Sequence, residues 1–112
     1  MGVVPAGLYL YGMLLYNVTI GIDREIENEW LAWMKTTHIP AILATGKFVD
    51  YKMYKILHDE GEPTISYSVQ YFAHTVADVS AYLEQHEPML GEELRVRYRD
   101  RHVVFRTLLE EV

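Results

Sequence analysis

His38 is the residue of this sequence whose type and position best suit acid–base chemistry. His38 follows a stretch of helical apolar spacing and precedes Pro40, which interrupts that helix. A residue before a proline avoids the α conformation, so we expect a break or kink near residues 38–39 that lets His38 reach the sheet edge. Because histidine titrates near neutrality, His38 is the candidate catalytic acid or base. The alternative, favoured on the residues alone, is that His38 satisfies backbone groups freed where the helix breaks.

Polar side chains on the predicted strands form a second candidate set. Asn17, Gln70 and Arg106 could orient a small polar or aromatic ligand if the strand register brings them together. Tyr51 and Tyr67 would add stacking surface or a phenolic proton. The favoured alternative is that these residues are hydrogen-bonded parts of an interface or of the edge of the core.

The amino-acid composition and residue spacing argue against several kinds of functional site. The chain has no cysteine, which excludes a thiolate nucleophile and Cys-ligated zinc or iron–sulfur sites. Its five histidines show no H-x-H or H-x3-H spacing, and there is no Gly-rich phosphate loop. The formal net charge of −6 opposes the basic surface that nucleic acid requires. We therefore expect no metal, no cofactor and no nucleic-acid partner.

Half of the basic residues lie near the C-terminus, at Arg95, Arg97, Arg99, Arg101 and Arg106. Arg95, Arg97 and Arg99 fall on different sides of a predicted helix, so they do not form one basic face. Neighbouring acidic residues balance them, at 92, 93 and 100. We interpret the group as charge pairing at a helix end, with an anion-binding patch as the less favoured alternative.

Apolar periodicity places these residues on secondary structure. Alternation predicts strands over residues 14–22, 48–57, 64–73 and 102–109. Asp23 resembles a helix N-cap, and Gly46 a C-terminal cap after a short helical piece that begins at Pro40. A second helical region extends from Thr75, with Asp78 as its capping-box partner, to about residue 99 with a restart at residue 88. Its buried residues are expected to be Val76, Val79, Tyr82, Leu83, Leu90, Leu94 and Tyr98.

The order strand–helix–strand–strand–helix–strand predicts an α+β, ferredoxin-like βαββαβ sandwich. Its four-stranded antiparallel sheet has the spatial order 4-1-3-2, with both helices on one face. The other face is neither consistently charged nor fully apolar, which favours pairing of two copies through that face. A monomer with a mildly polar open sheet is the alternative.

The N-terminal dozen residues are set apart from this pattern. We expect residues 1–12 to be a poorly ordered extension and residues 13–112 to form a single domain. Residues 3–20 are rather apolar, but they lack a basic start and a cleavage motif, and proline, glycine and asparagine interrupt them. We therefore expect no membrane segment and a cytoplasmic location.

Several stretches together carry a family resemblance. They are MLLYNVT (13–19), EWLAWMKTTHIPAILATGKF (29–48), YSVQYF (67–72) and FRTLLE (105–110). The chain resembles, from residue 13 to the end, a bacterial family known as domain of unknown function 4286. The resemblance implies the fold and pairing of dimeric α+β barrels, a group that includes monooxygenases, muconolactone isomerases and mutarotase-like proteins. A histidine near the position of His38 can line the pocket in such barrels, but no catalytic role is carried over.

Three functions remain open at this point. The leading hypothesis is a small-molecule-binding homodimer with a pocket between sheet and helices near His38. The second is a cofactor-independent dimeric-barrel enzyme of the monooxygenase, isomerase or mutarotase type, with His38 as acid or base. The third is a protein–protein interaction module that uses the open sheet face.

Overall fold

Strands and helices form two layers in a computed structural model that describes residues 12–57 and 61–112. The strands are β1 (Leu14–Asp23), β2 (Asp50–Ile56), β3 (Thr64–Ala73) and β4 (His102–Glu110). The helical segments are η1 (Arg24–Ile26), α2 (Glu27–Trp33), η2 (Met34–His38), α3 (Ile39–Leu43), α4 (Val76–Gln85) and α5 (Glu87–Arg97). The poorly ordered extension expected at the N-terminus (residues 1–11) and the predicted turn at 58–60 lie outside the described residues.

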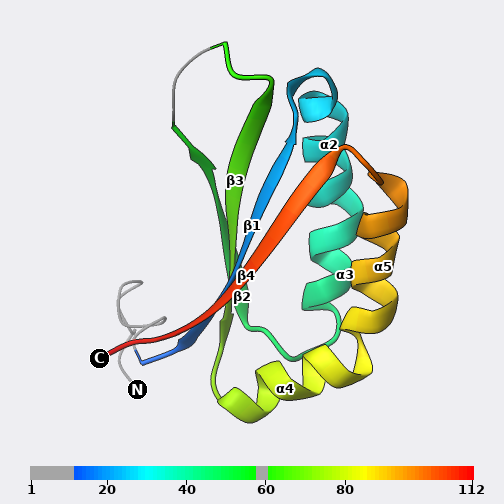
Figure 1. Cartoon of the computed structure of the whole chain (residues 1–112). Helices are drawn as coiled ribbons and strands as arrows, with labels where there is room; N and C mark the ends of the chain where they lie inside the picture. Colours follow the sequence, from blue (N-terminus) through cyan, green and yellow to red (C-terminus); the bar gives the residue numbers. More distant parts are fainter. Residues whose placement is uncertain (1–11, 58–60) are drawn as a thin grey trace.

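The strands form one antiparallel sheet in the order β2-β3-β1-β4. This is the predicted order read from the opposite edge. The helices all cover the same face of the sheet, and the other face is open in the described chain (Figure 1). The prediction of a ferredoxin-like α+β sandwich is therefore confirmed.

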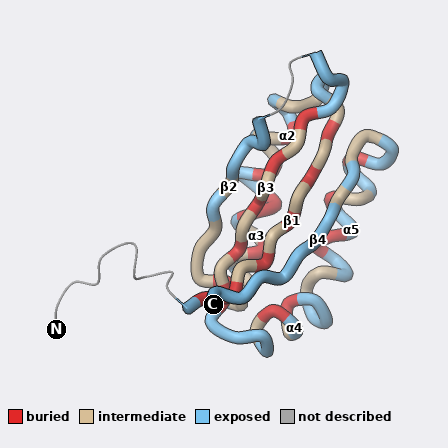
Figure 2. Tube along the Cα trace, turned by 60° about the vertical axis from the view of Figure 1, so that its left-hand side comes forward, coloured by how far each residue is buried: buried red, intermediate tan, exposed pale blue. Residues whose placement is uncertain are grey.

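The core lies between the two central strands and the helices. In β1 and β3 the residues alternate between buried and partly exposed along the whole strand, as the sequence predicts. Figure 2 shows this alternation in β1 and β3, and exposed residues along the edge strand β4. The largest fully buried side chains include Trp30, Met34 and Tyr71, which join the helix layer to the sheet.

The helix that carries His38 continues through Pro40 without a break, and the irregularity expected near residues 38–39 takes the form of a π-helical segment. Ile39 has helical φ and ψ of −63° and −46°, and its N–H donates to the Met34 carbonyl, five residues earlier. Residues 34–38 form a π-helical segment. This wider turn leaves room for the proline ring, which would clash with the carbonyl four residues earlier in a regular α-helix. As a result, His38 points into the protein rather than lying at a chain break.

Of the two caps predicted for this helical stretch, the structure contains the one at its C-terminal end and lacks the one at its N-terminal end. Asp23 does not cap the helix, because its carboxylate instead accepts a hydrogen bond from Arg101 Nε at 2.8 Å. Gly46 ends the stretch as predicted, with a φ of +77° and an N–H that donates to the Leu43 carbonyl.

The second helical region is divided into α4 and α5 at the predicted restart. Leu90, Leu94 and Tyr98 are buried, as expected, together with Val79 and Tyr82. Val76 and Leu83 are exposed, which contradicts their predicted burial. The physical reason is that α4 crosses the end of the two-layer structure, so that only a narrow stripe of it faces the core (Figure 1).

The cap of α4 provides a test of the local structure. The Thr75 hydroxyl accepts a hydrogen bond from the Asp78 N–H at 3.1 Å. We expect Thr75→Ala to lower the free energy of unfolding by about 1 kcal/mol, because that N–H loses its acceptor. Urea denaturation measures the change. Thr75→Ser keeps the hydroxyl and should lose much less; an equal loss in both variants would contradict the capping role.

Candidate functional site

A small cavity with mixed apolar and polar walls lies between the sheet and the helices. Its volume is about 30 Å³, room for roughly one water molecule. Strands β1, β3 and β4 form one wall, and segments η2, α3, α4 and α5 form the other. Its lining comprises Tyr16, Val18, Ile20, Met34, His38, Ile42, Tyr71, Tyr82, Glu87, Gly91, Leu94, Val104 and Arg106. Ionisable and apolar groups therefore meet around one small, partly open space.

His38 is the buried polar group of this cavity. Its side chain is 5% exposed, and its ring stacks on Trp33 with 4.9 Å between the ring centroids. Its Nδ1 is buried and has no hydrogen-bond partner in the described chain. Burial lowers the pKa of His38 from 6.5 to about 4, so the ring is neutral at pH 7. A neutral imidazole can donate or accept one hydrogen bond at each nitrogen.

Three tyrosines line the cavity together with His38. Tyr16 and Tyr71 come from the central strands and Tyr82 from α4, and their rings contact one another with centroids about 6 Å apart for the pairs that include Tyr16. Burial raises the pKa of all three phenols, while the nearby Arg106 partly offsets this for Tyr16 and Tyr82. The hydroxyl groups are therefore neutral hydrogen-bonding groups at physiological pH.

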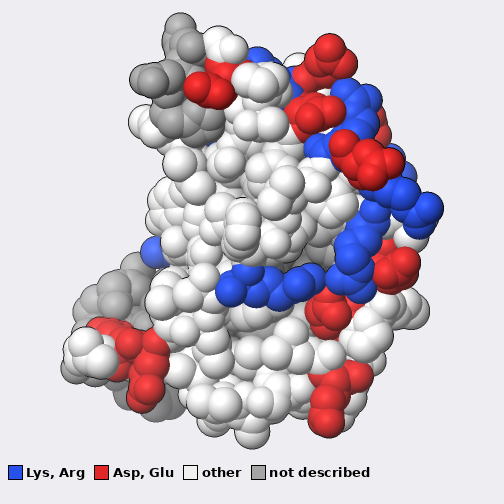
Figure 3. Space-filling model, viewed as in Figure 1, with Lys and Arg blue, Asp and Glu red and all other residues white. Residues whose placement is uncertain are grey.

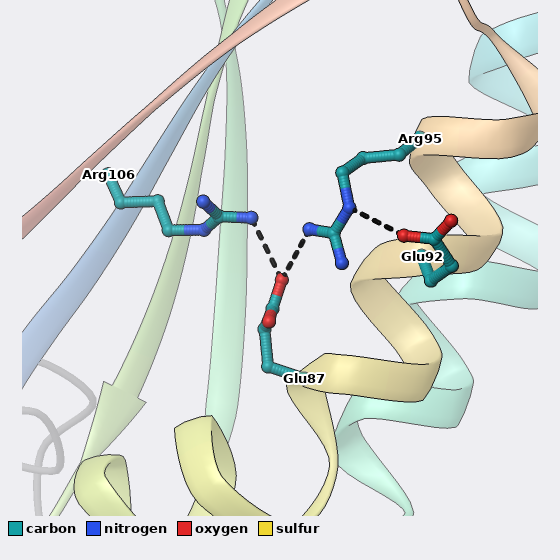
Figure 4. Close-up of polar contacts among 4 residues, drawn as sticks. All are labelled: Glu87, Glu92, Arg95 and Arg106. Carbon is teal, nitrogen blue, oxygen red and sulfur yellow. Dashed lines mark hydrogen bonds and ion pairs between the residues drawn. The ribbon is translucent and has the colours of Figure 1, made fainter.

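An ion-pair cluster lies at the edge of the cavity. Glu87 Oε1 accepts from Arg95 Nη1 at 2.8 Å and from Arg106 Nη2 at 2.9 Å, and Arg95 Nε also donates to Glu92 (Figure 4). The Glu87 side chain is 17% exposed, whereas that of Arg106 is 41% exposed. The cluster thus joins the start of α5 to the edge strand β4.

The predicted site residues on the helix-facing side of the sheet have different surroundings. His38 and Arg106 both line the cavity. Tyr51 lies beside Tyr71 in the strand register but does not line it. The Tyr67 hydroxyl donates to Glu27, which also pairs with Lys55 at 3.1 Å. Tyr67 therefore already has a structural partner.

Asn17 and Gln70 lie on the opposite, open face of the sheet, directly across from each other in the register. The Ser68 hydroxyl donates to Asn17 Oδ1 at 2.5 Å, and Gln70 Nε2 donates to the Ser68 hydroxyl at 3.3 Å. Asn17 Nδ2 also donates to Thr19 at 2.9 Å. The six predicted site residues thus occupy two faces and do not form one site.

Exposed apolar side chains flank this polar centre of the open face. Phe105 is 66% exposed, and Val103 and Leu109 beside it on β4 are also exposed. On the other edge, Tyr54 and Ile56 of β2 are exposed on the same face. Figure 3 shows that charged side chains gather on the side of α5, while the surface over the strands is mostly uncharged.

Two further hollows in the described residues are open grooves. An open groove of about 650 Å³ lies beside Trp33, Met89 and Val96, and another of about 750 Å³ lies near Arg24 and Pro63. Across residues 12–57 and 61–112, no His, Asp and Glu side chains form a group of three that would hold a metal ion. In the same residues, no helix has the length and apolar character needed to cross a membrane.

The sequence reasoning missed Glu87, Gly91 and the three cavity tyrosines, Tyr16, Tyr71 and Tyr82. A signal was present for the first two, because Glu87, Gly91 and Arg95 recur every four residues and so share one helix face. The tyrosines have no such signal. Arg106 acts electrostatically on Tyr16 and Tyr82, which lie far from it in the chain, and a proximity of this kind has no local signature.

Comparison with known families settles the classification. A family profile described as "Domain of unknown function (DUF4286)" matches residues 13–112. The chain belongs to the DUF4286 family. The resemblance noted from the sequence is therefore confirmed. A search of curated proteins gave no significant match.

Solved structures agree with this DUF4286 chain in fold. A protein from Bacillus halodurans described as an ethyl tert-butyl ether D (EthD) family protein is 14% identical, with a TM-score of 0.68, and covers 89% of this chain and 100% of its own. A dimeric ferredoxin-like protein from an uncultured marine organism is 12% identical, with a TM-score of 0.63, and covers 89% and 96%. At these identities the similarity shows the fold alone.

The burial of neutral His38 predicts a pH-dependent stability. Between pH 6.5 and about 4 the unfolded chain binds a proton on His38 and the folded chain does not, so stability falls as the pH falls through this window. Through His38 alone, the free energy of unfolding above pH 6.5 exceeds that below about pH 4 by on the order of 3 kcal/mol. His38→Phe keeps an aromatic ring and cannot titrate, so its unfolding free energy should fall less between pH 7 and pH 4.

Urea denaturation across this pH range measures the difference between the wild type and His38→Phe. His74→Phe is the matched control, because His74 is exposed and the substitution should retain the wild-type pH profile. Parallel pH profiles of the wild type and His38→Phe would show that His38 is not held neutral by the fold.

Proposed function

We propose that the protein is a homodimer that binds a small molecule in the His38 cavity of each subunit. The observation that carries this proposal is the unpartnered Nδ1 of a side chain that is 5% exposed. A buried polar atom without a partner costs about 1–3 kcal/mol, and an apolar side chain at this position would avoid that cost. A ligand or a water bound to it would supply the missing partner.

Binding fits this site better than acid–base catalysis by His38. An efficient general acid or base has a pKa near the working pH, and that of His38 is about 4. A neutral ring with one free nitrogen is well suited to fixing the orientation of a polar group on a ligand. Arg106 and the tyrosine hydroxyls Tyr16 and Tyr82 supply further polar contacts around apolar walls.

The cavity must widen to accept anything larger than water. The side chains at its edge, Glu87 and Arg106, reach solvent, and they are held by ion pairs rather than by tight apolar packing. Outward rotation of Glu87 opens the cavity, at the cost of its ion pairs with the partly exposed Arg95 and Arg106.

The open face of the sheet supports the homodimer. A polar centre with internally satisfied hydrogen bonds is flanked by exposed apolar residues such as Phe105 and Tyr54. Contiguous exposed apolar side chains on a sheet favour burial against another surface. One structural neighbour is described as a dimeric ferredoxin-like protein, and a second copy is the simplest partner for a face of this kind.

Ligand binding is tested by a screen of small polar and aromatic compounds using protein-observed NMR. We expect at least one compound to shift signals of His38 and of its cavity neighbour Tyr82. In His38→Phe its affinity should fall at least tenfold while the fold is kept, and His74→Phe should bind normally. Shifts confined to the open sheet face, or no binding at all, would contradict a ligand cavity at His38.

Dimer formation is tested by sedimentation and light scattering. Phe105→Glu places a charge on the open face and should convert a wild-type dimer to a monomer without loss of helical or strand signal in circular dichroism. Val96→Glu is the matched control, because Val96 is an exposed apolar residue of α5 on the other side of the molecule. A wild type that stays monomeric at micromolar concentration would leave the open face to a different protein partner and contradict the homodimer.

A further inference from the structure

The Glu87 carboxylate lies in a binding position built from two separate elements. Arg95, on α5, and Arg106, on β4, each donate to the same oxygen, Glu87 Oε1 (Figure 4). Both distances, 2.8 and 2.9 Å, are those of charge-assisted hydrogen bonds. Two guanidinium groups that converge on one oxygen form a receptor for a carboxylate.

Gly91 provides the space for this carboxylate. A Cβ at position 91 would lie 2.0 Å from Glu87 Oε1 and 2.9 Å from Arg95 Nη1. Glycine inside a helix costs about 1 kcal/mol relative to alanine, so α5 is less stable with Gly91 than it would be with alanine at this position. We define the carboxylate seat as Gly91, Arg95 and Arg106.

The seat opens onto the cavity that contains His38. Glu87, Gly91 and Arg106 all line that cavity, and the other walls are mainly aromatic and aliphatic. His38 Nδ1 is the buried atom that still lacks a hydrogen-bond partner there. An anion receptor at one end, aromatic and aliphatic walls, and a few neutral polar groups inside are complementary to a small organic acid.

We propose that the seat binds the carboxylate of a small organic acid with an aromatic or branched apolar body, and that Glu87 is an internal occupant which this ligand displaces. The inference rests on the function proposed above and assigns the class of ligand to that cavity. When Glu87 turns outward, its charge enters water and the ligand takes its place between the two guanidinium groups. One carboxylate replaces another, so the charge held in the seat does not change.

The chain offers variants that separate an empty seat from a blocked one. Glu87→Ala removes the internal competitor, so the fraction of protein that can bind rises and the apparent affinity for an organic acid increases. Gly91→Ala places a methyl group where the carboxylate must lie and should weaken binding, while its greater helix propensity favours the folded state. Glu92→Ala is the matched control, since Glu92 also pairs with Arg95 but lies outside the cavity lining.

The experiment is calorimetric titration of the full chain with benzoate, benzamide and inorganic phosphate at pH 7. We expect the wild type to bind benzoate at least tenfold more tightly than benzamide or phosphate. Glu87→Ala should tighten benzoate binding about tenfold, Gly91→Ala should weaken it at least tenfold, and Glu92→Ala should change it less than twofold. Arg106→Gln should remove the preference for benzoate over benzamide.

Other results overturn the proposal in distinguishable ways. Equal binding of benzoate and benzamide, both lost in His38→Phe, would retain the ligand cavity and reject the carboxylate seat. Equal binding of phosphate would show that the two arginines respond to charge alone. Benzoate binding by Glu87→Ala but not by the wild type would reject displacement of Glu87. If no probe binds to the wild type or to any variant, both the seat and the cavity function are wrong.

Discussion

The alternation of side chains along the two central strands decides where every other group can act. Tyr16, Val18 and Ile20 of β1 are buried against the helices, together with Tyr67 and Val69 of β3. Because successive side chains of a strand point to opposite faces, this burial forces the intervening residues onto the open face. Asn17 and Gln70 are therefore kept away from His38 by the same constraint that forms the core. A shift of one residue in register would exchange the two sets and expose the apolar one.

The π-helical segment is the second constraint, and it concerns the backbone. Pro40 has no N–H and its ring crowds the carbonyl four residues earlier, yet the helical path continues to residue 43. The chain resolves this conflict with a wider turn just before the proline, in which Ile39 donates to Met34. The same turn contains His38 and directs it inward, where Trp33 stacks on its ring. The departure from regular α-helix and the inward placement of a polar side chain thus occur in one segment.

Much of the fold follows from local patterns, because period-two alternation and turn residues act over short distances. The faces of β3, the Thr75 cap and the Gly46 turn were all evident from the residues. The surroundings of His38 were not evident, because Pro40 is compatible both with a break or kink of the helix and with a π-helical turn before it. The bond between Glu87 and Arg106 joins a helix to a strand 19 residues later, and only the packed fold determines it. Candidate residues were therefore easier to find than their neighbours.

The cavity joins two energetic conflicts that the rest of the fold tolerates. His38 keeps a buried nitrogen without a partner, and Gly91 weakens the helix that faces it. Each could be removed by one substitution, to an apolar ring in the first case and to alanine in the second. In the described chain, the core beside the cavity holds one further unpaired polar atom, the buried Trp30 Nε1, while Val69 and Ile22 are fully buried apolar residues without such a conflict. Stability alone would favour filling the cavity and removing the glycine. That both features lie on one lining, beside a carboxylate held by two arginines, is explained by a site that must be able to exchange its occupant.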